Sequence, residues 1–116
     1  MVSNQKLFLY FSEQNCQPCI IELVGCIKTI FPDYEKDENI IFVSPDYPAR
    51  LRRNCYGKKL LTPEKGALGI SLEKMYIPFL FTLDKDLRIN TLHIVDYNDI
   101  SKTLQYLELI KPHLSY

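Results

Sequence analysis

The stretch LFLYFSEQNCQPCIIELVGCIKTIFP, residues 7–32, decides the fold. It opens with a short apolar run, LFLYF, which predicts a buried β-strand at residues 7–11. After a polar turn, apolar residues recur at spacings of three and four, which predicts an amphipathic helix over residues 17–31. Cys16 and Cys19 therefore stand at the point where a strand passes into a helix.

The rest of the chain predicts further elements. In chain order these are a buried strand at 40–43, a short polar helix at 47–56 closed by Gly57, a loop at 58–75 with one helical turn at 71–75, strands at 79–83 and 89–95, and a last helix capped by Asn98 or Asp99 and stopped by Pro112. The first two strands are joined through a helix, so we expect them to be parallel with a right-handed crossover. The next two are separated by a short turn and should form an antiparallel hairpin. The predicted fold class is α/β, with a four-stranded mixed sheet flanked by about three helices.

Composition limits the classes of partner. With 116 residues, of which 47% are hydrophobic and 24% charged, the chain has the size and make-up of one globular domain spanning 1–116. Fourteen basic residues balance fourteen acidic ones, so no net field attracts nucleic acid or an anionic membrane. No apolar run is long enough to cross a bilayer. We therefore expect no nucleic-acid partner and no transmembrane segment in this chain, which would also fit a domain cut from a longer, anchored protein.

The spacing of the first two cysteines is suited to a disulfide that opens and closes. Cys19 lies one helical turn on from Cys16, so the two sulfurs can bond with a small adjustment of that turn. Unpaired backbone N–H groups and the positive end of the helix dipole favour the thiolate form of Cys16, which is the form that attacks a disulfide. Pro18 costs little in the first turn, because its missing N–H has no partner there to lose.

The third cysteine and the zinc alternative are weighed in the same terms. Cys26 lies seven residues after Cys19, about 10 Å along a helix, whereas a disulfide needs Cα atoms within roughly 7 Å. The sequence therefore predicts that Cys26 is a small buried hydrophobe. Structural zinc needs four ligands, usually from a second cysteine pair, whereas Cys55, His93 and His113 stand singly. A redox pair is favoured over a metal site, and no cofactor is implied.

The residues LFLYFSEQNCQPC, followed by an apolar helix and by IPFLF about sixty residues on, resemble the thioredoxin superfamily. Within it they are similar to the TlpA-like and alkyl-hydroperoxide-reductase/TSA-type thioredoxin-like domains of envelope proteins from Bacteroidetes. The resemblance covers roughly residues 6–114. It implies a thioredoxin-like fold with a minimal, glutaredoxin-like core, and a place in the periplasm or cell envelope, with the cytoplasm as the alternative.

The resemblance also implies a function. A member of this group would be a thiol-disulfide oxidoreductase that acts on protein disulfides or dithiols, or on a redox partner protein. Cys16 would be the nucleophile and Cys19 the resolving cysteine. Pro78 would be a cis-proline facing the pair, and the backbone of Ile77 would hydrogen-bond an extended substrate. The substrate-binding residues implied are Ile77, Pro78, Gln17 and Pro18.

Two departures from the family pattern suggest a second hypothesis. Thioredoxins proper carry a buried acid six residues before the first cysteine, where this chain has Tyr10. They also carry tryptophan just before the pair, where this chain has Asn15. Without that acid, proton transfer to Cys19 loses its usual base. The alternative is therefore a thioredoxin-fold binding module with weak or no redox activity.

Overall fold

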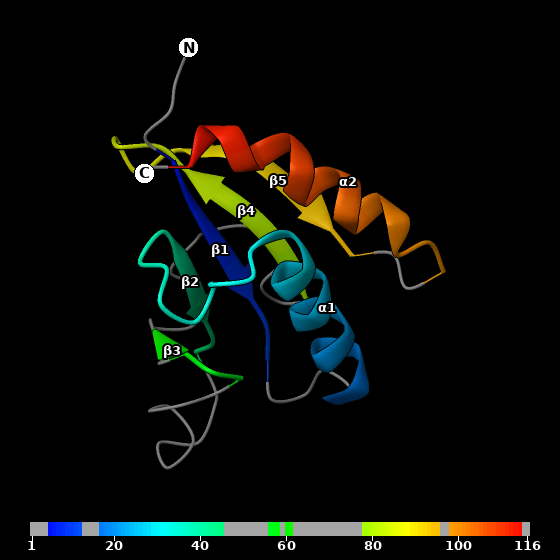
Figure 1. The fold of residues 1–116 in the computed structure, drawn as a ribbon. Helices are drawn as coiled ribbons and strands as arrows, with labels where there is room; N and C mark the ends of the chain where they lie inside the picture. The colour runs from blue at the N-terminus through cyan, green and yellow to red at the C-terminus, as the bar shows by residue number, and fades with distance from the viewer. Residues whose placement is uncertain are drawn as a thin grey trace.

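The computed structural model of the protein describes residues 5–12, 17–45, 56–58, 60–61, 78–95 and 98–114. In chain order its elements are β1 (Lys6–Tyr10), α1 (Gln17–Ile30), β2 (Ile40–Val43), β3 (Leu60–Leu61), β4 (Phe79–Leu83), β5 (Ile89–Ile94), α2 (Ser101–Ile110) and a 3-10 helix, η3 (Lys111–His113). The strands form one mixed sheet in the order β3-β2-β1-β4-β5, as Figure 1 shows.

The sheet is built around β1. This strand is parallel to β2, to which the chain passes through α1, and antiparallel to β4. On the outer side of β4, β5 pairs antiparallel to it, and on the outer side of β2, β3 pairs parallel. The predicted parallel crossover and the predicted hairpin are both confirmed.

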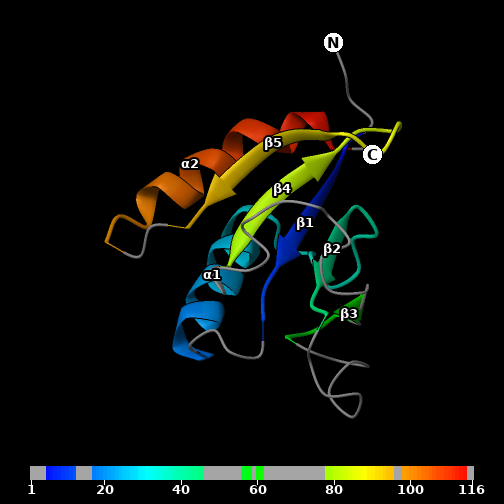
Figure 2. The same ribbon diagram turned by 180° about the vertical axis from the view of Figure 1, so that it is seen from behind.

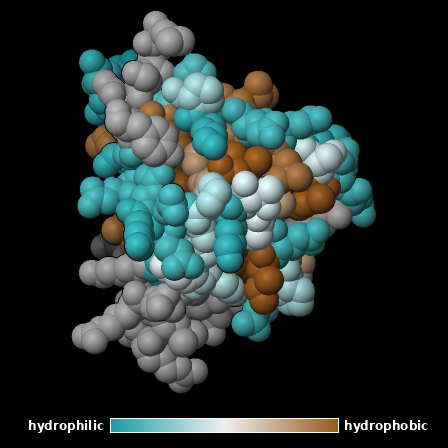
Figure 3. All heavy atoms as spheres, in the orientation of Figure 1, coloured by the Kyte–Doolittle hydropathy of each residue, from teal (hydrophilic) through white to brown (hydrophobic). Residues whose placement is uncertain are grey.

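Both long helices lie on one face of the sheet. Figure 1 shows α1 and α2 in front of the strands, and Figure 2 shows the strands in front of both helices. The main hydrophobic core lies between these layers, and α1 contributes Ile20, Leu23, Val24, Cys26 and Ile27 to it. On the side of the molecule that carries the helices, hydrophobic residues are visible at the surface among hydrophilic ones (Figure 3). In the part of the chain that the structure describes, neither helix has the length and apolar character needed to span a membrane.

The opposite face of the sheet carries a second, aromatic cluster. Successive side chains of a strand point to opposite faces, so the neighbours of the main-core residues Leu7 and Leu9 point away from the helices. The buried members of this second cluster are Tyr10, Val43, Phe79 and Phe81, with Phe8, Ile41 and Leu83 packed against them. The sheet is therefore apolar on both faces near its centre.

Asp84 holds the turn between β4 and β5. Its side-chain Oδ1 accepts hydrogen bonds from the backbone N–H groups of Asp86 at 2.9 Å and Arg88 at 3.0 Å. Its backbone carbonyl accepts from Leu87, which has a positive φ of 62°. An aspartate that bonds its own turn in this way is the reason such residues favour turns, so the prediction of a tight hairpin here was sound.

The sheet has five strands rather than the four predicted. The additional strand, β3, lies within residues 58–75, which the sequence predicted to be a loop. Ser44 N–H donates to the Leu61 carbonyl at 3.0 Å and extends the pairing of β3 with β2. A strand of two residues is too short to show an alternating pattern, which explains the error.

The last helix starts later than predicted. Ile100 stands at its N-cap and makes no side-chain cap hydrogen bond, so neither Asn98 nor Asp99 is the N-cap residue. The Asp99 carboxylate instead accepts a hydrogen bond from the Ser101 hydroxyl. At the other end the α-helix stops at Ile110 and the chain tightens into η3, which contains the predicted stop, Pro112.

The remaining predicted helical segments fall outside the described residues. These are residues 47–55 of the short polar helix and the turn at 71–75. Where the description resumes, Tyr56 and Gly57 have positive φ angles of 54° and 88°, which places the predicted closing residue, Gly57, in a turn. The described helices are thus α1, α2 and η3.

Candidate active site

The candidate site begins where β1 ends. Phe11 and Ser12 continue beyond β1 and are both buried, at 1% and 7% exposure. The Phe11 N–H donates to the Val43 carbonyl of β2 at 3.1 Å, which fixes the direction in which the chain leaves the sheet. Residues 13–16, which include Cys16, lie outside the described residues, and α1 begins directly after them.

The first turn of α1 is exposed on one side and anchored on the other. Gln17 and Pro18 are exposed, Cys19 is half-buried, and Ile20 is buried in the main core. The first turn contains no acidic residue. An anion near this turn therefore meets the positive end of a helix dipole that no carboxylate within the turn offsets.

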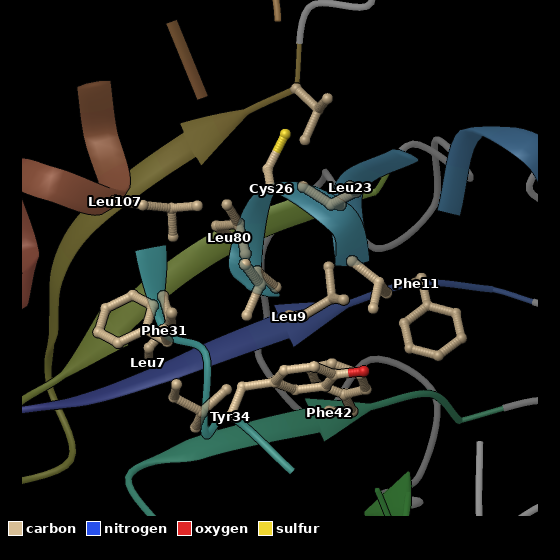
Figure 4. Close-up of a cluster of buried hydrophobic side chains, with 14 of the residues drawn as sticks. Leu7, Leu9, Phe11, Leu23, Cys26, Phe31, Tyr34, Phe42, Leu80 and Leu107 are labelled. Carbon is tan, nitrogen blue, oxygen red and sulfur yellow. The ribbon is translucent and has the colours of Figure 1, made fainter. Parts of the chain in front are cut away.

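The two described cysteines have different states. Cys19 is disulfide-bonded, whereas Cys26 is a free thiol. Burial, and secondarily the charge of Glu22, raises the pKa of Cys26. Figure 4 shows Cys26 in the main core, together with Leu23 of the same helix and Leu80 of β4. Cys26 is thus the buried hydrophobe that the sequence predicts, and α1 runs unbroken past it.

The start of β4 lies at the same end of the sheet as the start of α1. Tyr10, the last residue of β1, pairs in register with Phe79, the first residue of β4. Their rings are stacked with centroids 4.8 Å apart and planes 16° apart. Pro78, which is buried, directly precedes Phe79. The antiparallel pairing therefore brings Pro78 to the end of the sheet at which the chain leaves β1 toward the cysteines.

Some of the predicted site residues are not described. Cys16 and Ile77 fall outside the described residues, whereas Gln17, Pro18, Cys19 and Pro78 fall within them. The peptide bond before Pro78 includes Ile77, so its cis form stays a prediction. The roles of the cysteines and of the two residues between them stay predictions as well.

His93 pairs in register with Leu80, the residue after Phe79, and so lies toward this end of the sheet, whereas His113 bonds Gln5 just before β1, at the opposite end. His93 of β5 lies beneath α2, where its Nε2 is 3.0 Å from Thr103 Oγ1 and its ring stacks on that of Tyr106 at 4.9 Å. Burial lowers the pKa of His93. His113 lies in η3. Among the described residues, no three His, Cys, Asp or Glu side chains gather as a metal site would require.

Two arrangements were missed by reasoning from the sequence. The first is a polar chain between sheet and helix, in which Thr91 Oγ1 is 2.7 Å from both Thr82 Oγ1 and Tyr106 Oη. The alternation of Thr91 and His93 with apolar residues along β5 signalled a polar face there. The second is the Tyr10–Phe79 stack, whose only sequence signal is an aromatic residue at the end of one apolar run and at the start of another.

Comparison with solved structures identifies the fold. The N-terminal domain of PilB from Neisseria meningitidis, in its reduced form, matches with a TM-score of 0.57 at 16% identity, covering 91% of this chain and 80% of that one. A thioredoxin-like protein from Porphyromonas gingivalis matches with a TM-score of 0.54 at 17% identity, covering 96% and 78%. The exposed lipoprotein thioredoxin of Streptococcus pneumoniae matches with a TM-score of 0.51 at 16% identity, covering 90% and 85%.

Comparison of the sequence with protein-family models and with curated proteins gives no match. The fold similarity is nevertheless extensive, because it covers nine-tenths or more of the chain in each of these structures. The strand order, the crossover through α1 and these similarities agree, and the chain therefore has a thioredoxin-like fold.

Proposed function

We propose that this chain is a thiol-disulfide oxidoreductase that exchanges disulfides with protein substrates through Cys16 and Cys19. One observation carries the proposal: the first turn of α1, which bears Cys19, and the buried Pro78 lie at the same end of the sheet. The disulfide-bonded state of Cys19 supports it. Cys16 is the partner that the proposal assigns, because it precedes α1 directly and stands one helical turn from Cys19.

The proposed reaction balances in two steps. The Cys16 thiolate attacks one sulfur of the substrate disulfide, forms a mixed disulfide, and releases the other substrate sulfur as a thiolate. Cys19, once deprotonated, attacks the Cys16 sulfur, closes the Cys16–Cys19 disulfide and releases the second substrate thiolate. The substrate gains two electrons and the pair loses two. In the opposite direction, the same steps oxidise a substrate dithiol.

The proposed substrate contacts follow from what surrounds the pair. Gln17 and Pro18 are exposed on the first turn and present a surface to an incoming chain. Pro78 has no N–H, so it cannot compete with a substrate for a backbone acceptor. We assign the backbone of Ile77 as the group that hydrogen-bonds an extended substrate strand. The partners proposed are thus protein disulfides, protein dithiols or a redox partner protein.

Three cysteine variants test the proposed function. Cys16→Ser should abolish reduction of a protein disulfide, because the nucleophile is lost. Cys19→Ser should keep the first step and accumulate a mixed disulfide with the substrate, detectable by non-reducing electrophoresis. Cys26→Ala, which removes a buried free thiol, should keep the activity of the wild type and serves as the control. Full activity of Cys16→Ser would falsify the proposed role.

A specific observation favours a second candidate function, the thioredoxin-fold binding module. Tyr10 occupies the position of the buried acid, and its ring packs in the aromatic cluster on the face opposite α1. A module that only binds would reduce model disulfides no faster than free dithiol, yet would still hold an extended peptide at the Pro78 end. Equal rates for the protein and for free dithiol would therefore favour this candidate.

We further propose that residues 1–116 form one thioredoxin-like domain of the cell envelope. The lipoprotein thioredoxin that shares the fold is an exposed protein, which supports this location. Fractionation of cells that produce the full natural protein tests it. Recovery in the cytoplasmic fraction alone would contradict the proposed location.

A further inference from the structure

Four aromatic rings form a ladder between β1 and β4 on the face opposite the helices. Phe8 stacks on Phe81 with centroids 5.0 Å apart and planes 5° apart. Tyr10 stacks on Phe79 at 4.8 Å and 16°. A contact between Phe79 and Phe81 at 5.7 Å joins the two pairs. The pairs are two residues apart on the same strands, but only the Tyr10–Phe79 pair stands at the candidate site.

Pro78 directly precedes Phe79, the first paired residue of β4. The pairing of β4 with β1 starts at Phe79, opposite Tyr10. Proline has no N–H, so Pro78 cannot extend the strand by donating a hydrogen bond. The residue next to it, Phe79, is fully buried. Across the strand pair, the stack of the Tyr10 ring on Phe79 is thus the ring contact that lies next to Pro78 in the sequence.

Tyr10 also belongs to the segment that leads to the cysteines. It is the last residue of β1 and lies six residues before Cys16. It is itself buried, at 4% exposure. One stacked pair thus joins the chain segment that carries the nucleophile to the segment that carries Pro78.

Resting on the proposed function, we propose that Tyr10 is a positioning residue for substrate binding: its ring holds Phe79, and through Phe79 it sets where Pro78 stands relative to the first turn of α1. Tyr10 touches neither sulfur in this role. Its loss should weaken the docking of substrate and leave the chemistry of the thiols unchanged.

The matched variants are Tyr10→Leu at the outer pair and Phe8→Leu at the inner pair. An aromatic pair contributes enough energy that losing it should raise KM for a protein disulfide about three- to tenfold in Tyr10→Leu, with kcat retained. The reduction potential of the pair should stay at its wild-type value. Phe8→Leu should lower the melting temperature about as much as Tyr10→Leu does, but it should leave KM at its wild-type value. Tyr10→Phe keeps the ring and should keep the wild-type KM.

A readout independent of activity separates this inference from the proposed function. The side-chain 13C resonances of Pro78 should move in Tyr10→Leu and stay in place in Phe8→Leu. Unmoved Pro78 resonances in Tyr10→Leu, equal movement in both variants, or an unchanged KM would each overturn the positioning role. If the wild type exchanges no disulfides, the proposed function fails, and the Pro78 resonances alone decide the positioning role. Should Tyr10→Leu not fold, Tyr10→Met removes the ring with an unbranched side chain that adapts to the remaining space, and is measured in its place.

Discussion

At the scale of single residues, the turn that leads into β3 requires two successive residues with positive φ. Tyr56 and Gly57 both have positive φ, and Gly57 faces the side chain of Glu35. A Cβ at Gly57 would lie 2.7 Å from both Glu35 Cγ and Cδ. The Tyr34 hydroxyl donates to the Tyr56 carbonyl at 2.7 Å, so the same turn is also tied to the loop after α1.

Gly57→Ala should destabilise the protein by about 1–2 kcal/mol, because an L side chain is disfavoured at this φ and the Glu35 side chain must move. Urea unfolding measures the change. Gly25→Ala is the control: Gly25 lies on the exposed side of α1, and a Cβ there meets nothing within 4 Å. It should stabilise the protein by about 0.5–1 kcal/mol through helix propensity. Equal effects at both sites would contradict this account.

At the scale of elements, Lys58 links the approach to β3 with the loop that follows α1. Its ammonium donates to the carbonyl of Tyr34 at 2.6 Å and to that of Asp37 at 2.8 Å. Burial lowers the pKa of Lys58, while the charges of Asp37 and then Glu35 act in the opposite direction. The half-buried ammonium thus donates to two backbone carbonyls in place of water.

Lys58→Met should lower the free energy of unfolding by about 1–2 kcal/mol, because it removes two charge-assisted hydrogen bonds and keeps most of the aliphatic chain. Thermal or urea unfolding measures it. Lys36→Met, on the exposed surface of the same loop, should change stability by less than about 0.5 kcal/mol. The prediction is wrong if the two variants are equally stable.

The packing of β5 against α2 makes the stability of the protein depend on pH. Burial lowers the pKa of His93 from its ordinary value of 6.5, so the folded protein binds this proton less tightly than the unfolded chain does. Below pH 6.5 the unfolded state therefore holds more protons, and the free energy of unfolding falls as the pH decreases. Tyr106, whose pKa burial raises to about 12, stays neutral throughout this range.

His93→Gln should flatten this dependence between about pH 6.5 and 5, because it removes the group that titrates differently in the two states. Urea unfolding of both proteins at several pH values within the window is the measurement. A variant that loses stability with falling pH as steeply as the wild type would show that His93 is not the cause.

The elements differ in how well the sequence reveals them. The stripe of Ile20, Leu23 and Ile27 recurs at spacings of three and four within a helix of 14 residues, so α1 was predicted within a residue of its ends. The start of α2 was missed because Asn98 and Asp99 are good capping residues in general, yet Asp99 bonds the Ser101 hydroxyl instead. Strand β3 exists through its pairing with β2, which is a property of the sheet and not of residues 60–61 themselves.

At the scale of the whole molecule, stability rests on the core between the sheet and the two helices. Leu80 of β4 is fully buried there, whereas Leu92 of β5 is 46% exposed. Leu80→Ala should cost about 2–5 kcal/mol, because it removes buried methyl groups and leaves a cavity. Leu92→Ala should cost less than about 0.5 kcal/mol. Denaturant midpoints compare them, and similar losses would place the core elsewhere.

The candidate site was predicted in its parts more than in its assembly. The strand-to-helix position of Cys19 could be predicted from the change of period after residue 11. That Pro78 comes to the same end of the sheet depends on the antiparallel register of Tyr10 with Phe79, which no local pattern contains. Side-chain stacking across strands far apart in sequence is decided by the fold, so it could only be seen in three dimensions.

Helix α1 is fastened at the end farthest from its first turn. Lys111 of η3 donates to the Ile30 carbonyl at 3.0 Å and lies over the Phe31 ring at 5.6 Å, and Phe31 is itself buried. Deuterium should therefore enter the amides of α1 from the Gln17 end, while those near Ile30 stay protected. A disulfide at Cys19 can then form and break while the contacts of Lys111 with Ile30 and Phe31 stay in place.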